Sequence, residues 1–143
     1  IGGGDTHRLH LDDMVLIKDN HIAVAGSIDK AVKKVKKGVS FTKKIEIEVS
    51  KLDDVLDAAE ARADIIMLDN FSPEQVVTAV DLLKKSRFFG NVLLEASGGI
   101  TAESILKFAS TGVDIISLGE ITDSVKALDV SLKVVKVKRN RRR

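Results

Sequence analysis

The sequence contains no cysteine, no tryptophan, no tyrosine and a single proline. The absence of cysteine excludes disulfide bonds, thiolate zinc sites and cysteine nucleophiles. Five phenylalanines are the only aromatic residues, so the chain has little with which to stack nucleic-acid bases. No apolar run approaches the roughly 18 residues of a membrane span, and the N-terminus lacks the layout of a signal peptide. We therefore expect a soluble, cytoplasmic protein with neither a nucleic-acid partner nor a membrane partner.

The composition is that of one globular domain with a basic tail. Of the 143 residues, 44% are hydrophobic and 31% are charged. The last eleven, residues 133–143, include seven Lys or Arg and no acid, so subtracting them from the net charge of +2 leaves −5 for residues 1–132. Such a tail is either a solvated terminus, the simpler interpretation, or an arm for an anionic surface.

The first residues suggest that the sequence is a piece of a longer chain. It begins Ile1-Gly2-Gly3-Gly4, without methionine, as though entering a loop. We expect a domain over residues 1–132 that follows a further segment.

Short apolar runs alternate with amphipathic stretches along the chain. The runs predict five strands: Met14–Ile17, Ile45–Val49, Ile65–Leu68, Val92–Ala96 and Ile115–Leu118. The stretches between them have the apolar spacing of helices. Ser27, Ser72 and Thr101 are expected at helix starts, Gly38 and Gly112 at helix ends, and a sixth helix is expected to begin near Ser124.

Alternating strands and helices predict a parallel α/β architecture, because parallel neighbours need a crossover. A closed eight-stranded barrel typically takes about 250 residues. Five β/α units therefore predict an incomplete, open parallel β/α barrel, part of a larger barrel, or else an open sheet. No G-x-G-x-x-G follows a strand, which argues against dinucleotide binding.

Candidate chemical groups fall at the carboxyl ends of the strands, where β/α proteins place their sites. Alternation along the second strand turns Glu46 and Glu48 to the interior, where a carboxylate needs a cation. Lys18 is one candidate, and Mg²⁺ shared with Asp69 is another. We interpret Glu46 as structural, in a Lys–Glu pair, and Glu48 as functional.

Glycine turns after the last two strands predict a phosphate site. Ser97-Gly98-Gly99, followed by Thr101, offers free backbone N–H groups, and Gly119 follows the next strand. His7 and Arg8 form a candidate anion-binding couple.

The other histidines have simpler interpretations. We interpret His10 as a surface residue and His21 as structural. A phosphate site, a divalent metal and a lysine at the strand ends fit either a group transferase or an aldolase that forms a Schiff base through Lys18. A catalytically silent phosphate-binding domain is the third possibility.

Six ordered motifs carry a family resemblance over residues 2–133. They are Gly2-Gly3-Gly4-x-x-His7-Arg8, Leu16–His21, Glu46-x-Glu48-Val49, Leu68–Phe71, Leu94-Glu95-x-Ser97-Gly98-Gly99 and Thr111–Asp114. In this order and spacing the chain resembles quinolinate phosphoribosyltransferase, also called carboxylating nicotinate-nucleotide pyrophosphorylase.

The resemblance implies a reaction and its partners. Quinolinate and phosphoribosyl pyrophosphate would react with Mg²⁺ to give nicotinate mononucleotide, carbon dioxide and pyrophosphate for NAD synthesis. It also implies a homodimer or higher homo-oligomer of longer chains. Their N-terminal half, with a sandwich domain, is missing here and is needed for activity.

The resemblance also implies roles for single residues. His7, Arg8 and Lys18 would bind the substrate; Lys18, Glu48 and Asp69 would be catalytic. Glu48 and Asp69 would hold the metal, and the phosphate would lie at Ser97, Gly98, Gly99 and Gly119.

Two positions depart from the family pattern. Thr6 replaces an asparagine, and Asp123 replaces a histidine near the phosphate, where an acid would repel it unless it turns away or caps a helix. A paralogous group associated with molybdenum transport is a further alternative, but the stretch Ile17–His21 favours the biosynthetic enzyme.

Overall fold

Five short strands pair side by side in the order in which they occur in the chain. The computed structural model describes residues 3–125 and 127–136. Its parallel sheet has the order β1-β2-β3-β4-β5. The strands are β1 (Val15–Ile17), β2 (Ile45–Val49), β3 (Ile65–Asp69), β4 (Leu93–Ser97) and β5 (Ile115–Ile116). All five predicted strands are therefore present, and the open parallel β/α architecture is confirmed.

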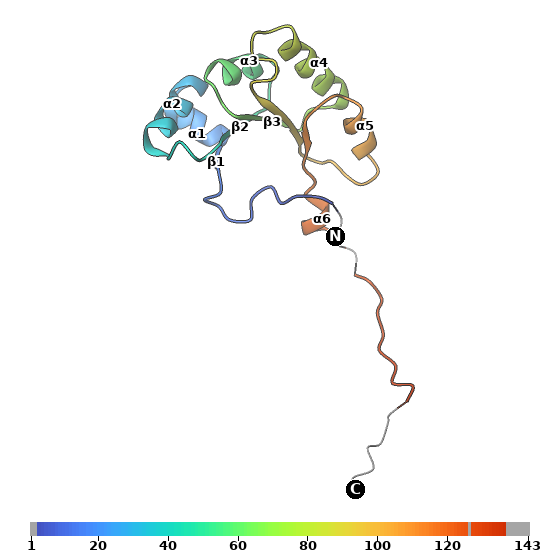
Figure 1. Cartoon of the computed structure of the whole chain (residues 1–143). Coiled ribbons are helices and arrows are strands. Elements are labelled where there is room, and N and C mark those ends of the chain that lie inside the picture. Colours follow the sequence, from blue (N-terminus) through green and yellow to red (C-terminus); the bar gives the residue numbers. More distant parts are fainter. Residues whose placement is uncertain (1–2, 126, 137–143) are drawn as a thin grey trace.

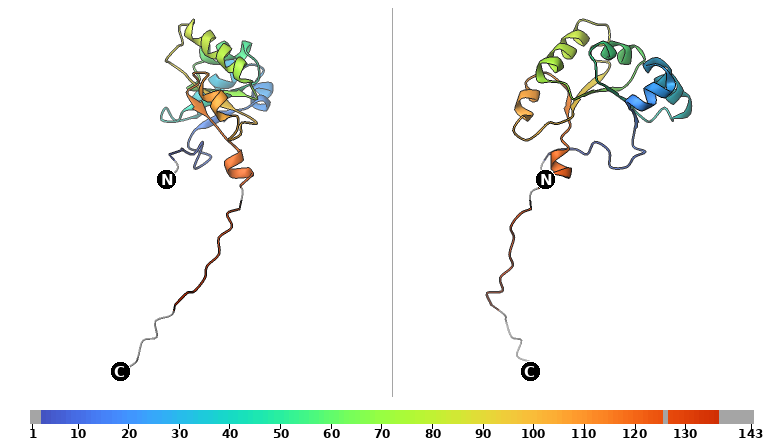
Figure 2. Two further views of the ribbon diagram at one scale, coloured as in Figure 1. Left: turned by 90° about the vertical axis from the view of Figure 1, so that its right-hand side faces the viewer. Right: turned by 180° about the vertical axis from the view of Figure 1, so that it is seen from behind.

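Of the six described helices, the first five follow one strand and precede the next and arch over one face of the sheet, whereas the last follows β5 and lies apart from this arch (Figure 1). They are α1 (Asp19–Ala25), α2 (Ile28–Gly38), α3 (Asp53–Glu60), α4 (Pro73–Lys84), α5 (Ile105–Ala109) and α6 (Glu120–Asp123). The view from behind shows the same arch from α1 to α5 (Figure 2). Each crossover thus returns the chain over the same side, as parallel pairing with right-handed connections requires.

The core lies between the sheet and this layer of helices. On β2, Ile45, Ile47 and Val49 are buried and alternate with the two glutamates. Val32 of α2 and Val55 of α3 are fully buried in the same apolar cluster. The side chains that point toward the helices therefore stabilise the fold. The alternate side chains, on the inner face of the sheet, are free for other chemistry.

None of the helices α1 to α5 lies over the inner face between β1 and β5 (Figure 1). Residues 3–14 run along that side instead, in irregular conformation, before entering β1 (Figure 1). Partners in register lie on the same face, and these include Glu48 with Met67 and Asp69 with Ser97. The inner face is therefore lined by polar side chains near the carboxyl ends of the strands.

Most of the predicted helix starts are confirmed in detail. The Ser27 Oγ accepts a hydrogen bond from Lys30 N–H, and Ser72 forms a reciprocal capping box with Gln75. Thr101 and Ser104 exchange the same kind of contacts in the turn that leads into α5.

The sixth helix was wrongly placed by the sequence. It occupies Glu120–Asp123 and ends before Ser124, because Gly119 accepts the backbone bonds that open it. Residues 127–136, which include the first residues of the basic tail, form neither helix nor strand. The rest of the predicted tail, residues 137–143, lies outside the described residues.

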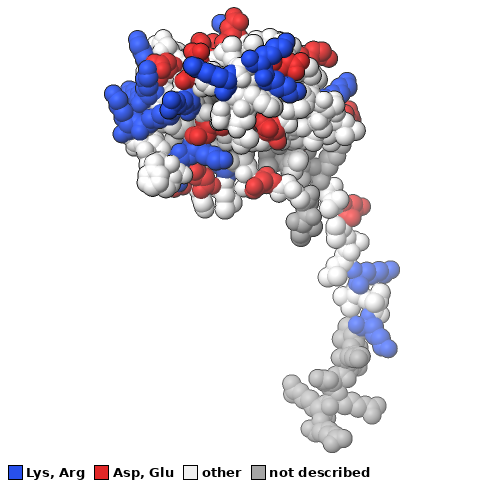
Figure 3. Space-filling view, turned by 45° about the horizontal axis from the view of Figure 1, so that its top comes forward, with Lys and Arg blue, Asp and Glu red and all other residues white. Residues whose placement is uncertain are grey.

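Charged side chains cover the helix side of the molecule. Lys and Arg gather on the left of Figure 3, where α1 and α2 lie in Figure 1. Helix α2 exposes five lysines there: Lys30, Lys33, Lys34, Lys36 and Lys37. Among the described residues, the structure has no helix that is both long and apolar enough to cross a bilayer.

Candidate functional site

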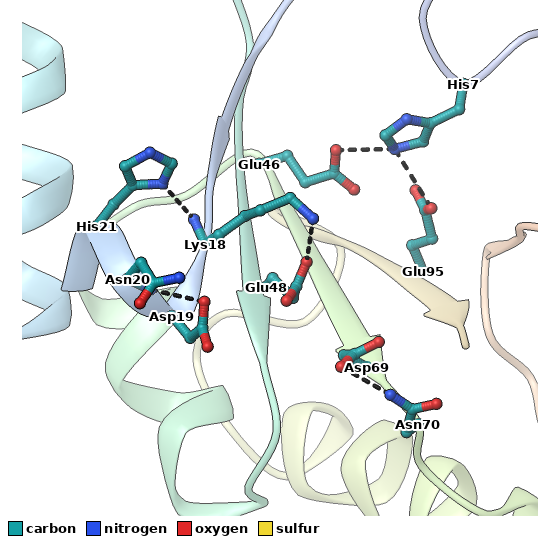
Figure 4. Close-up of polar contacts among 10 residues, drawn as sticks. All are labelled: His7, Lys18, Asp19, Asn20, His21, Glu46, Glu48, Asp69, Asn70 and Glu95. Carbon is teal, nitrogen blue, oxygen red and sulfur yellow. Dashed lines mark hydrogen bonds and ion pairs between the residues drawn. The ribbon is translucent and has the colours of Figure 1, made fainter. Parts of the chain in front are cut away.

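Lys18 and Glu48 form an ion pair at the carboxyl ends of β1 and β2. The Nζ of Lys18 lies 3.2 Å from Oε2 of Glu48 (Figure 4). The Glu48 side chain is 17% exposed and that of Lys18 is 52% exposed. The predicted cation for Glu48 is therefore in place, and the pair remains open to solvent on the inner side of the sheet.

Asp69 ends β3 beside the start of the glycine turn. Its Oδ2 accepts a hydrogen bond from Nδ2 of Asn70, and it is paired in register with Ser97. Asn70 has a positive φ of 57°, and its backbone N–H donates to the carbonyl of Ser97. The ends of β3 and β4 are thus joined by the backbone, which holds the Asp69 carboxylate near the turn.

Gly98 is required by this close approach. It has a φ of +92°, and a Cβ atom there would lie 2.8 Å from the backbone nitrogen of Asn70. Gly99 also has a positive φ, +60°, but has open space around it. A tight turn is therefore present at Ser97-Gly98-Gly99, and its first glycine cannot be replaced without a clash.

An acidic side chain occupies part of the predicted phosphate cradle. The backbone N–H of Ala102, three residues after Gly99, donates to Oε2 of Glu120 at 2.8 Å. This contact brings the Gly119 segment against the turn, so the two predicted glycine segments do come together. The Glu120 carboxylate thereby occupies a backbone N–H group that could otherwise donate to a bound phosphate.

Asp123 neither turns away nor caps a following helix. Its Oδ2 lies 3.0 Å from where a Cβ on Gly119 would be, and its Oδ1 accepts a hydrogen bond from Ser124 Oγ. A negative charge therefore stays beside Gly119. This arrangement weakens Gly119 as a phosphate ligand.

Sequence reasoning missed a cluster of three side chains on the inner face. His7 Nε2 lies 3.0 Å from Glu46 Oε2 and 3.4 Å from Glu95 Oε1 (Figure 4). Glu46 and Glu95 are 0% and 1% exposed. The partner of Glu46 is therefore a histidine from the N-terminal segment, and the expected Lys–Glu pair at this position is wrong.

The environment of Glu46 disfavours its charged form. Burial raises the pKa of Glu46 to about 8, and the nearby carboxyl of Glu95 adds to this shift, while Arg8 opposes it. Ser117 Oγ donates to Oε1 of Glu95 at 2.6 Å. Two carboxyl groups are thus held close together with little water around them.

A signal for Glu95 was present in the sequence. It follows Leu94 and precedes Ala96 in an apolar run, and an acid at a buried strand position needs a partner. The contact itself was not predictable, because His7 approaches from an irregular segment.

The other basic residues singled out in the sequence differ in exposure and in contacts. Arg8 is half-buried and close enough to affect Glu46. His21 accepts a hydrogen bond from the backbone N–H of Lys18 at 2.9 Å, which confirms its structural role. His10 is exposed, as expected. Of the His7–Arg8 couple, His7 contacts the buried carboxyl groups of Glu46 and Glu95.

Comparison with known proteins identifies relatives across the whole of this site. The chain matches the family described as quinolinate phosphoribosyl transferase, C-terminal domain, over residues 1–133. It is 53% identical over 134 residues to a probable carboxylating nicotinate-nucleotide pyrophosphorylase of Methanothermobacter thermautotrophicus. It is 42% identical over 134 residues to the carboxylating nicotinate-nucleotide pyrophosphorylase of Homo sapiens.

These relatives are longer than the chain. The alignments cover 94% of this chain in both cases, but 48% of the archaeal protein and 44% of the human one. The chain therefore spans about half the length of the curated relatives it matches.

A solved structure agrees in fold as well as in sequence. The nicotinate-nucleotide pyrophosphorylase from Francisella tularensis is 51% identical and superposes with a TM-score of 0.82, over 91% of this chain and 44% of that one. Because the family match covers every site residue described above, this chain belongs to the quinolinate phosphoribosyl transferase family, as its C-terminal domain.

Proposed function

We propose that this chain supplies the catalytic face of a carboxylating nicotinate-nucleotide pyrophosphorylase. The reaction joins the ring nitrogen of quinolinate to the ribosyl carbon of phosphoribosyl pyrophosphate. Pyrophosphate leaves, carbon dioxide is lost, and nicotinate mononucleotide forms. The observation that carries the proposal is the row Lys18, Glu48, Asp69 and Ser97, on the inner side of four strand ends, in a chain that matches the family.

The basic residues serve the carboxylates of quinolinate. Lys18 remains half exposed while paired with Glu48, so its ammonium can turn to a substrate without exposing a buried charge. Arg8 and His7 lie on the segment that crosses the same face. Together they neutralise a dianionic acid before bond formation.

The carboxylates of Glu48 and Asp69 serve the ribosyl centre and Mg²⁺. Both end neighbouring strands, and two carboxylates with open solvent beside them are a donor set that suits this ion. When bound, Mg²⁺ neutralises the developing charge of the pyrophosphate. The Glu48 charge itself stabilises a positive, oxocarbenium-like carbon as the glycosidic bond breaks.

The phosphate of the substrate lies at Ser97, Gly98 and Gly99, with Gly119 nearby. The backbone N–H of Ala102 becomes available to it only when the Glu120 carboxylate leaves. Phosphate binding at this turn therefore includes the displacement of an acidic side chain.

The complete enzyme includes an N-terminal half and pairs as a cytoplasmic homodimer. Residues 1–132 then form the C-terminal part of its barrel, and residues 133–143 form a basic tail. The charges on the inner face support this part of the proposal. Three carboxylates, those of Glu48, Asp69 and Glu95, outnumber the permanent cations Arg8 and Lys18, while the pKa of Glu46, raised to about 8, keeps this group protonated near neutral pH. Further positive charge must come from outside this chain to balance two anionic substrates.

The test is a hybrid enzyme that joins the N-terminal half of the Methanothermobacter relative to this chain. The 53% identity over this half favours a compatible interface. We expect the hybrid enzyme to release carbon dioxide from quinolinate in the presence of phosphoribosyl pyrophosphate and Mg²⁺, and to elute as a dimer. This chain alone should show no turnover. A folded hybrid enzyme without turnover would contradict the proposed activity, and turnover by the chain alone would contradict the need for a second half.

A further inference from the structure

We propose that His7, Glu46 and Glu95 form a binding site for a divalent transition-metal ion, of which Zn²⁺ is the representative. This site is separate from the pair Glu48 and Asp69. It joins β2, β4 and the N-terminal segment on the inner face of the sheet (Figure 4).

The geometry is that of metal ligands around one point. One nitrogen and two carboxylate oxygens, one from each residue, all lie within 4.8 Å of one another. Ligands about 2.0–2.2 Å from a common ion are separated by roughly 3.0–3.5 Å from one another. The distances from His7 Nε2, 3.0 Å to Glu46 and 3.4 Å to Glu95, fall in this range.

A second observation concerns the hydrogen bonding of the Glu46 carboxyl group. Its side chain is fully buried, and among the described residues neither of its oxygens has a hydrogen-bond partner. His7 Nε2 is close to Oε2, yet it does not meet the geometry of a hydrogen bond to it. Burial disfavours a charged Glu46 unless something compensates the charge, and a cation between the three side chains would take the place of the proton that otherwise neutralises this carboxyl group.

The ligand set selects the class of ion. Imidazole with two carboxylates suits Zn²⁺ and related transition ions, whereas Mg²⁺ prefers oxygen ligands alone and keeps several waters. Ser117 donates a hydrogen bond to Glu95, which orients this ligand as outer-shell groups do in metal sites.

The site has an entry path and an open position. The His7 side chain is 31% exposed, whereas both glutamates are buried. Three protein ligands leave at least one position for water or for an anionic group. In the proposed function, a carboxylate of the substrate would occupy this open position, so that the ion lies between it and His7. That last detail rests on the proposed function, whereas binding of the ion does not.

Calorimetric titration of this chain with ZnCl₂ and with MgCl₂ tests the proposal directly. We expect Zn²⁺ to bind, and the substitutions His7→Gln, Glu46→Gln and Glu95→Gln each to weaken it at least about tenfold. His10→Gln is the matched control on the same segment, because His10 is exposed and belongs to no cluster. It should bind Zn²⁺ as the parent chain does. Mg²⁺ should bind equally to the parent chain and to His7→Gln.

Spectroscopy distinguishes a lost metal site from a variant that has failed to fold. His7 lies in an irregular segment, so circular dichroism of His7→Gln should match that of the parent chain. In ¹⁵N NMR spectra of the parent chain, Zn²⁺ should shift the Nε2 resonance of His7 and leave that of His10 unchanged. Equal Zn²⁺ affinity in His7→Gln and His10→Gln, or an unshifted His7 resonance at saturation, would overturn the proposal. Neither result depends on turnover by the hybrid enzyme.

Discussion

Gly98 lies so close to Asn70 that a Cβ atom on Gly98 would stand 2.8 Å from the backbone nitrogen of Asn70. That nitrogen donates to the carbonyl of Ser97, so the contact is part of the link between the ends of β3 and β4. We expect Gly98→Ala to destabilise the fold by more than about 2 kcal/mol, because it adds a backbone clash to a left-handed conformation. Urea denaturation of the chain measures the change.

Gly99→Ala is the matched control for this effect. Its φ is also positive, but a Cβ there would meet nothing within 4 Å. The conformational cost alone is about 1–2 kcal/mol. If the two substitutions destabilise the chain equally, the close approach to Asn70 has no energetic role.

Glu48 and Asp69 should affect the rate of the hybrid enzyme more than its stability. Glu48→Gln and Asp69→Asn remove charge at the ribosyl centre with little change in shape. We expect each to lower kcat at least about a hundredfold, as for loss of one preorganised electrostatic group. Asp29→Asn, at an exposed pair with Lys33 on α2, should retain full activity. An unchanged kcat in both Glu48→Gln and Asp69→Asn would show that these carboxylates have only structural roles.

Lys18 should not form a Schiff base. Its Nζ lies 3.2 Å from Oε2 of Glu48, so the side chain is already engaged by a carboxylate and is not presented as a free nucleophile to a carbonyl substrate. After treatment with a small phosphorylated ketone and borohydride, mass spectrometry should find no more label on Lys18 than on the exposed Lys33. Selective labelling of Lys18 would support the aldolase interpretation.

Glu120 should compete with the phosphate of a bound nucleotide. Its carboxylate accepts from the Ala102 N–H, so Glu120→Gln removes a negative charge from the glycine turn. We expect the hybrid enzyme with this change to bind nicotinate mononucleotide more tightly, by about tenfold or 1.4 kcal/mol. Glu103→Gln, an exposed acid nearby, is the control. Equal affinity of the parent and Glu120→Gln would show that the phosphate binds elsewhere.

Glu46 should make the stability of the chain depend on pH. Its pKa rises from 4.5 to about 8 on folding, so the folded state holds an extra proton between these values. Stability must therefore fall as pH rises through this window. In metal-free buffer containing EDTA, the melting temperature of Glu46→Gln should fall less than that of the parent between about pH 5 and about pH 8. Glu60→Gln, an exposed site on α3, should behave like the parent, and parallel curves for Glu46→Gln and the parent would contradict the shift.

The strands and the Lys18–Glu48 pair were predictable from the sequence because local patterns determine them. Alternation on β2 separates Ile45 and Ile47 from the glutamates, and both Lys18 and Glu48 end strands that neighbour each other in the chain. Parallel pairing of consecutive strands then brings their ends together. Ser72 and Gln75 were predictable for the same reason, since a capping box is complete within four residues.

The cluster around His7 was not predictable from such patterns. Glu46 and Glu95 lie on strands separated by β3, and His7 reaches them from a segment without regular structure. The position of α6 was wrong for a related reason. Ser124 has the composition of a cap, but the turn at Gly119 begins the helix earlier, and Glu120 is held by a contact with Ala102. Tertiary contacts decide both features.

The order of the strands has a consequence for how the chain folds. Each strand pairs only with the units before and after it, so every crossover closes a loop of modest length. Short loops are quick to close, and contacts that are local in sequence favour rapid folding. The sheet can therefore grow unit by unit from any central pair. Side chains from non-adjacent strands, such as Glu46 and Glu95, meet only after the strand between them has docked, so the inner face is assembled late.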